Sequence, residues 1–163
     1  HYRNPEMTLA ILNKIEEKYG KDVDIWLFGS DDVRDVVEEK YLAFNWRQLG
    51  KLTQVQVASM MSKADIFTDF SSHQAMGLSA LEAMAAGCSV IVPKNGGAVE
   101  FINHNINGIV ADTSMSQASQ LALEKLIEDD ELRKNIQIKG INDVVKYYPE
   151  KVSYNILRTL FSS

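Results

Sequence analysis

Along most of the chain, segments whose apolar residues have the spacing of a strand alternate with segments whose apolar residues have the spacing of a helix. The run from Val23 to Phe28 is almost continuously apolar and stops at Gly29-Ser30, which predicts a short strand buried on both faces. Similar short runs predict strands at residues 44–49, 65–70, 90–92 and 109–111. Helical spacing predicts helices at residues 5–19, 31–41, 54–61, 78–86, 99–102, 114–127, 132–145 and 152–161.

Strands that alternate with helices indicate a doubly wound, Rossmann-like α/β fold, in which helices cover both faces of a parallel sheet. Asn4-Pro5 and Thr53 provide capping signals for two of the helices. Ligands of such folds bind beyond the carboxyl ends of the strands. The loops that follow the predicted strands are therefore the candidate site: residues 29–30, 50–52, 70–77 and 93–97.

The helix at residues 78–86 is almost wholly apolar, and Glu82 is its one charged residue. A helix that is apolar all round is expected to be buried on every side, where a carboxylate needs a partner. One candidate is an arginine or lysine from elsewhere in the chain. The other is a ligand, because Gly77 stands at the helix start, where free N–H groups and the helix dipole attract phosphate. A carboxylate one turn further on can accept hydrogen bonds from the two hydroxyls of a ribose.

Composition narrows the class of protein. The 163 residues fit one domain, and 45% apolar with 24% charged residues is typical of a globular protein. A net charge of -5 without a basic stripe argues against nucleic-acid binding. Cys88 is the one cysteine and cannot form an internal disulfide, which favours a reducing compartment. Its surroundings have the pattern of a small core residue. No apolar run reaches the ~20 residues of a membrane span, and no signal peptide is evident.

The segment QAMGLSALEAMAAGCSVIVPKNGGAVEFINHNINGIVAD resembles the donor-binding half of retaining GT-B glycosyltransferases of family 4, also called group 1. The resemblance extends over essentially the whole chain. The residues in register with the family pattern are Ser71, Gly77, Leu78, Glu82, Ala83, Met84, Ala85, Gly87, Val90, Gly96, Gly97, Glu100, Asn107 and Gly108. It implies that residues 1–163 form the C-terminal nucleotide-sugar-binding domain of a two-domain enzyme. The missing first strand of the alternating pattern agrees with a fragment that lacks an N-terminal acceptor domain.

The resemblance also implies roles for individual residues. Glu82 matches the second glutamate of a Glu-x7-Glu pair and is expected to hold the ribose, while Gly77 and Leu78 present backbone to phosphates and sugar. Arg3 is expected to neutralise the diphosphate, and Gly50, Lys51 and Leu52 to clasp the base. The expected catalytic residues are Gln74 and Glu82. The full set of expected donor-binding residues is Arg3, Gly29, Lys51, Leu52, Ser71, His73, Met76, Gly77, Leu78 and Glu82. No metal and no cofactor is expected.

Gln74 is the main departure from the family pattern, because it replaces the first glutamate of the pair. Glutamine keeps one acceptor oxygen but loses the stronger, charge-assisted hydrogen bonds. It fits a donor whose hydroxyl pattern differs from glucose, such as a deoxy sugar; a less active enzyme is the alternative. Ala75-Met76 replaces a Gly-Phe pair, and Ser89 replaces a proline. His73 either faces the donor or lies in solvent, the second being favoured.

These features predict a retaining hexosyl- or deoxyhexosyltransferase of bacterial glycan or polysaccharide biosynthesis. Its partners would be a nucleotide-diphosphate sugar and, through the missing domain, a glycan or lipid-linked acceptor. The isolated domain is expected to be inactive, in the cytoplasm or peripherally at the inner face of the membrane. The alternatives are a nucleotide-sugar 2-epimerase on the same scaffold and a non-catalytic Rossmann-like binding module.

Overall fold

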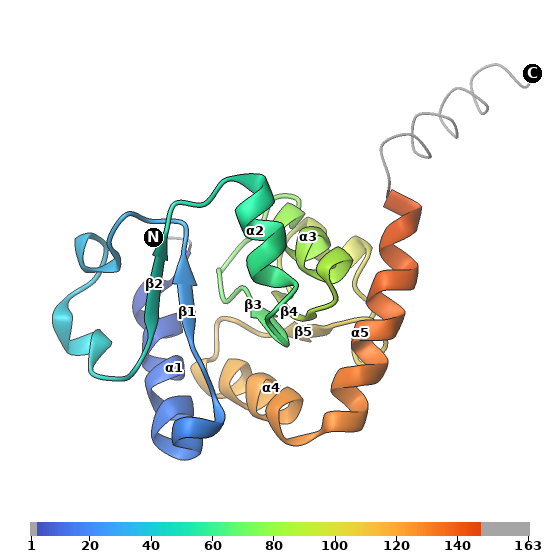
Figure 1. Ribbon diagram of the computed structural model, residues 1–163. Helices are drawn as coiled ribbons and strands as arrows, with labels where there is room; N and C mark the ends of the chain where they lie inside the picture. The colour runs from blue at the N-terminus through green and yellow to red at the C-terminus, as the bar shows by residue number, and fades with distance from the viewer. Residues whose placement is uncertain (1–2, 148–163) are drawn as a thin grey trace, which may run out of the picture.

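The computed structural model describes residues 3–147, which fold into helices packed around two parallel sheets (Figure 1). The helix predicted at residues 152–161 lies outside the described residues. The helices are α1 (Pro5–Tyr19), α2 (Gln54–Met61), α3 (Leu78–Ala86), α4 (Ser116–Glu128) and α5 (Asp130–Val144). The strands are β1 (Trp26–Phe28), β2 (Arg47–Gly50), β3 (Ile66–Thr68), β4 (Ser89–Pro93) and β5 (Ile109–Ala111). Short 3-10 turns occupy Gly20–Asp22, Val33–Asp35, Glu39–Leu42, Gly97–Glu100 and Val145–Tyr147.

The larger sheet has the strand order β3-β4-β5 and separates two apolar cores. β4 is buried along its whole length, and its side chains alternate between the two faces. Ile91 belongs to the core that includes residues of α1 and α4, whereas Val90 and Val92 belong to the core that includes residues of α2 and α3. The α/β fold with helices on both faces of parallel strands is therefore confirmed.

The second sheet is a parallel pair, β1 and β2, that does not hydrogen-bond to the first. Trp26 lies opposite Arg47 in this pair, and the register shifts between Leu27 and Phe28. Leu27 packs against one apolar core and Phe28 against the other, so both faces of β1 are covered, but its side chains are half-buried rather than fully buried as predicted. Periodicity reports that residues are apolar, but it does not report how many neighbouring elements cover them.

The prediction of a helix at residues 31–41 is also wrong, because only two 3-10 turns form there. Asp32 accepts a hydrogen bond from the Arg34 backbone N–H at 2.9 Å and also pairs with its guanidinium. Such a local side-chain bond competes with helix formation. The strand predicted at residues 44–49 forms as Arg47–Gly50, and Phe44 is buried in the core instead.

Two helix starts differ in how they are capped. Thr53 and Gln56 form a capping box at α2, which confirms the prediction that Thr53 caps this helix. Asn4 precedes Pro5 as predicted, but its side chain does not cap α1. Instead Asn4 adopts a left-handed backbone conformation with φ 45°, and its Nδ2 donates to the Phe70 carbonyl at 3.3 Å. The start of α1 is thereby fixed next to the loop that follows β3.

Cys88 is buried, as the sequence predicts, and its Sγ donates to the Met61 carbonyl at 3.1 Å. Burial raises the pKa of this thiol to about 11, which keeps it protonated at neutral pH. Within residues 3–147, no helix is both long and apolar enough to cross a membrane.

Candidate functional site

α3 has one open face, which corrects the prediction of a helix buried on every side. Ala80, Ala83 and Met84 are buried, whereas Leu78 and Glu82 are exposed one turn apart. The helix contacts α2, α5 and β4, and these neighbours leave the face of Leu78 and Glu82 uncovered. Glu82 is therefore not a buried charge.

The alternative partner proposed for Glu82 was a basic residue of the chain. Among residues 3–147, no arginine or lysine forms an ion pair with Glu82. Because helical side chains lean toward the amino end, the Glu82 carboxylate lies over the turn that contains Leu78. This face can receive a polar ligand that arrives at the start of α3.

Gly77 begins α3 in a left-handed conformation with φ 73°, and it is buried. A Cβ at this position would lie 2.8 Å from the Ala98 Cβ and 3.2 Å from the Phe101 ring. Packing alone therefore requires glycine here. The same close packing holds the first, unpaired N–H groups of α3 in fixed positions, where they are suited to an anion.

The loop before α3 and the loop after β4 interlock. Gln74 and Gly96 form an isolated β-bridge, and the Gly97 N–H donates to the Gln74 carbonyl at 2.9 Å. The Gln74 N–H donates to the Asn95 carbonyl at 3.1 Å. Added Cβ atoms at Gly96 and Gly97 would lie 1.9 Å and 2.5 Å from backbone oxygens of the first loop. The two glycine-containing loops singled out from the sequence thus form one unit.

The side chain of Gln74 is held by Asp69, a residue that the sequence analysis did not single out. The Gln74 Nε2 donates to the Asp69 Oδ2. The other carboxylate oxygen, Oδ1, accepts from the Ser71 backbone N–H at 2.9 Å and from the Ser71 hydroxyl. The Ser71 carbonyl in turn accepts from the Thr113 hydroxyl at 2.7 Å. An aspartate two residues before a serine at a strand end is an Asx-turn signal that would have identified Asp69.

The remaining predicted residues of this loop differ in exposure. Ser71 is buried, and its hydroxyl is used by Asp69. His73 is exposed. Met76 is 65% exposed, which is close to the exposed fraction of Leu78, 58%. Arg3 is exposed just before α1. The structure thus leaves His73, Met76, Leu78 and Arg3 accessible to a ligand.

The loops after β1 and β2 also meet, because the Gly29 N–H donates to the Gly50 carbonyl at 2.9 Å. Lys51 forms an exposed ion pair with Asp31, and Leu52 is half-buried. Gly29, Lys51 and Leu52, which were predicted together from the resemblance, therefore lie on one pair of neighbouring loops.

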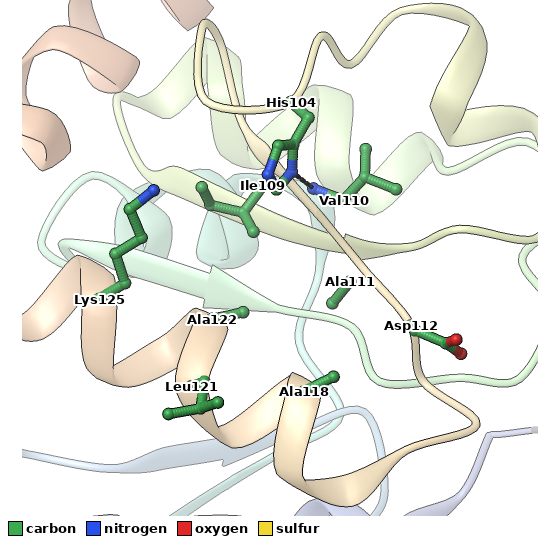
Figure 2. Close-up of a pocket in the computed structure, with 9 residues that line it drawn as sticks. All are labelled: His104, Ile109, Val110, Ala111, Asp112, Ala118, Leu121, Ala122 and Lys125. Carbon is green, nitrogen blue, oxygen red and sulfur yellow. Dashed lines mark hydrogen bonds between the residues drawn. The ribbon is translucent and has the colours of Figure 1, made fainter.

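A hollow of about 240 Å³ lies elsewhere, between β5 and α4 (Figure 2). Its lining includes His104, Ile109, Leu121 and Lys125, and none of the predicted site residues. His104 is exposed, as expected for a turn residue, and its Nδ1 accepts from the Val110 N–H at 3.1 Å. At the rim, Lys94 and Ser114 lower the pKa of the Asp112 carboxyl to about 2.

The fold is that of a doubly wound α/β domain, and comparisons with known proteins assign this domain to a family. Residues 1–143 match the family described as "Glycosyl transferases group 1", so the chain belongs to this family. One relative is an uncharacterized glycosyltransferase of Methanocaldococcus jannaschii, 28% identical over 88% of this chain and 37% of its own length. Another is 2-deoxystreptamine N-acetyl-D-glucosaminyltransferase of Niallia circulans, 25% identical over 100% of this chain and 43% of its own length.

Solved structures agree in fold. HepE of Anabaena, in complex with UDP and glucose, has a TM-score of 0.82 at 21% identity over 99% of this chain and 46% of its own. The chain thus spans less than half the length of these three proteins. It is a domain of the group 1 glycosyltransferase family, with the fold of one half of a GT-B enzyme.

Proposed function

We propose that this domain binds the nucleotide-diphosphate sugar of a retaining glycosyltransferase that acts in glycan or polysaccharide assembly. The observation that carries this proposal is the open face of α3. Glu82 and Leu78 are exposed one turn apart at the end of the helix where Gly77 fixes the first N–H groups. A phosphate at that helix start would bring an attached ribose beside the Glu82 carboxylate.

Glu82 is suited to a ribose because its carboxylate accepts two hydrogen bonds from neighbouring hydroxyls. No cation of the described residues 3–147 competes for it in an ion pair. A phosphate bound directly to Glu82 would be repelled, so the ribose and the phosphates occupy different turns of the helix.

The diphosphate leaving group would be stabilised by positive potential from two sources. One is the amino end of α3, and the other is the exposed guanidinium of Arg3. We propose that these groups act without a metal ion. Transfer with retention to an acceptor hydroxyl would take place on the sugar, next to Gln74.

The relatives support a nucleotide sugar as the donor. HepE was solved in complex with UDP and glucose, and the Niallia circulans enzyme is named for transfer of N-acetyl-D-glucosamine. Those names do not assign a base, a sugar or an acceptor to this protein, because its own loops determine which of them it binds.

The test is calorimetric titration of the full natural protein with nucleoside diphosphates and nucleotide sugars. Replacing Glu82 by alanine removes the ribose acceptor and should weaken nucleoside diphosphate binding by about tenfold or more, near 1.4 kcal/mol. Unchanged affinity in Glu82→Ala would refute the ribose assignment.

Glu131→Ala is the matched control, because Glu131 is also an exposed glutamate in a helix. It lies at the start of α5, which reaches the amino end of β4 through the bond from Ser89 Oγ to the Arg133 carbonyl at 2.9 Å. This is the opposite end of β4 from residues 95–97, which bind the loop at the start of α3, so the control should keep full affinity.

A further inference from the structure

Gln74 is fixed on three sides. Its backbone N–H and carbonyl are bound by Asn95 and Gly97, and its side-chain amide is bound by Asp69. Within residues 3–147 no donor is hydrogen-bonded to the remaining polar atom, Oε1. Gln74 is half-buried, and its Oε1 is not a buried unsatisfied atom, so this oxygen is open to solvent.

The chemistry of Asp69 decides which amide atom faces outward. A carboxylate oxygen accepts hydrogen bonds, so only the NH2 group of Gln74 can bind it. The other oxygen of Asp69 is already occupied by the N–H and hydroxyl of Ser71, which prevents the carboxylate from turning away. The side-chain oxygen of Gln74, Oε1, therefore faces outward, where it can only accept hydrogen bonds.

We infer that Asp69 is a positioning residue for donor recognition: it holds the Gln74 amide so that Oε1 accepts a hydrogen bond from a hydroxyl of the transferred sugar. The inference rests on the proposed function. It assigns sugar specificity to the pair Asp69 and Gln74 rather than to Gln74 alone. The negative charge nearest the transferred sugar is then carried by Asp69, which lies behind the contacting residue Gln74.

The same geometry explains why residue 74 is not acidic here. A glutamate at position 74 would direct an oxygen at the Asp69 carboxylate, and two carboxylates in contact repel each other. Gln74→Glu alone should therefore displace the side chain and weaken sugar binding. Asp69→Asn should instead invert the Gln74 amide, because the new NH2 group of residue 69 would seek the Gln74 oxygen. The outward atom would then be a donor.

The double variant Asp69→Asn with Gln74→Glu separates positioning from general damage. Asparagine can keep its oxygen on Ser71 and donate its NH2 to the new glutamate, which again presents an acceptor outward. We expect each single variant to weaken nucleotide-sugar binding about tenfold while nucleoside diphosphate binding changes less than about twofold. The double variant should return to within about threefold of the natural protein.

The matched control is Asp112→Asn, since Asp112 binds the N–H of Ser114 at 3.1 Å and its hydroxyl in the same type of turn after β5. It should leave both affinities unchanged. The side-chain ¹⁵N signal of Gln74 in NMR spectra should shift in Asp69→Asn and stay in place in the control.

The outcomes distinguish the two ideas. If neither ligand binds the natural protein, the proposed function is overturned, and this inference with it. If both bind but Asp69→Asn weakens them equally, or the double variant is no better than the singles, Asp69 has only a structural role and the inference alone is overturned.

Discussion

At the scale of single residues, Gly96 is the glycine with the least room for a side chain. Its φ of 131° disfavours other residues, and an added Cβ would lie 1.9 Å from the Gln74 carbonyl oxygen. Gly96→Ala must therefore separate the two interlocked loops, and we expect a loss of about 2–4 kcal/mol in the free energy of unfolding.

Gly20→Ala provides the comparison, because Gly20 also has a positive φ of 53° but no atom within 4 Å of the added Cβ. It should cost only the backbone strain, about 1–3 kcal/mol. Urea unfolding of both variants measures the difference. An equal loss of unfolding free energy in both variants would show that separating the two interlocked loops costs no stability.

Glu82 shows what a single sequence can and cannot reveal about a residue. Its position as the one charge in helix α3 singled it out as a candidate site residue, but the expected burial is wrong. Composition cannot reveal which side of a helix lacks a neighbour. The bond between Gln74 and Asp69 was equally inaccessible, since it depends on how the loop folds back by five residues.

At the scale of elements, local signals predicted the ends of α3 and β5 correctly. Gly77 and Gly87 flank α3 in left-handed conformations, and the Asn107-Gly108 turn precedes β5. Such signals act over a few residues and are visible in a sequence. The competing Asp32 side chain at residues 31–41 is also a local signal, which the helical spacing of the apolar residues outweighed in the prediction. The half-burial of β1 depends instead on the whole tertiary structure.

α5 is tied to the turn before β5 by a polar cluster around Asp143. This buried residue accepts from Lys146 at 2.8 Å, from Lys139 at 3.1 Å and from the Asn107 Nδ2 at 3.1 Å. Lys146 is the main cause that holds the pKa of Asp143 below its ordinary value, with Lys139 and Asn107 adding to it against the opposing effect of burial.

Asp143→Ala should lower the free energy of unfolding by about 1–3 kcal/mol, because it leaves the buried amide of Asn107 short of a partner. A folded-state pKa below the unfolded value means that the contribution is present above about pH 4 and is lost as the pH falls further. Urea unfolding at pH 7 and pH 3 measures this. The difference between natural protein and variant should shrink at pH 3; an undiminished difference would exclude an ionic origin.

At the scale of the whole molecule, the two sheets differ in how well they are protected. β4 is buried throughout and paired on both sides, whereas β1 is half-buried and paired in a two-stranded sheet. Local opening is least costly where apolar contacts are few.

Hydrogen exchange followed by mass spectrometry should therefore show slow exchange at residues 89–92 and faster exchange at residues 26–28. We expect at least about a hundredfold difference in protection, corresponding to about 2.7 kcal/mol in opening free energy. Equal protection would mean that both sheets open only when the entire domain unfolds.

The interlock of the loops at Gln74 and Gly96 has a consequence for exchanging donor preference between relatives. Residue 74 sits against the 95–97 loop through its backbone and against residue 69 through its side chain. Replacing residue 74 alone by the residue of a relative would introduce a side chain without the neighbouring residues that orient it. The smallest transplantable cassette in this protein is discontinuous and consists of residues 69–77 together with residues 95–97.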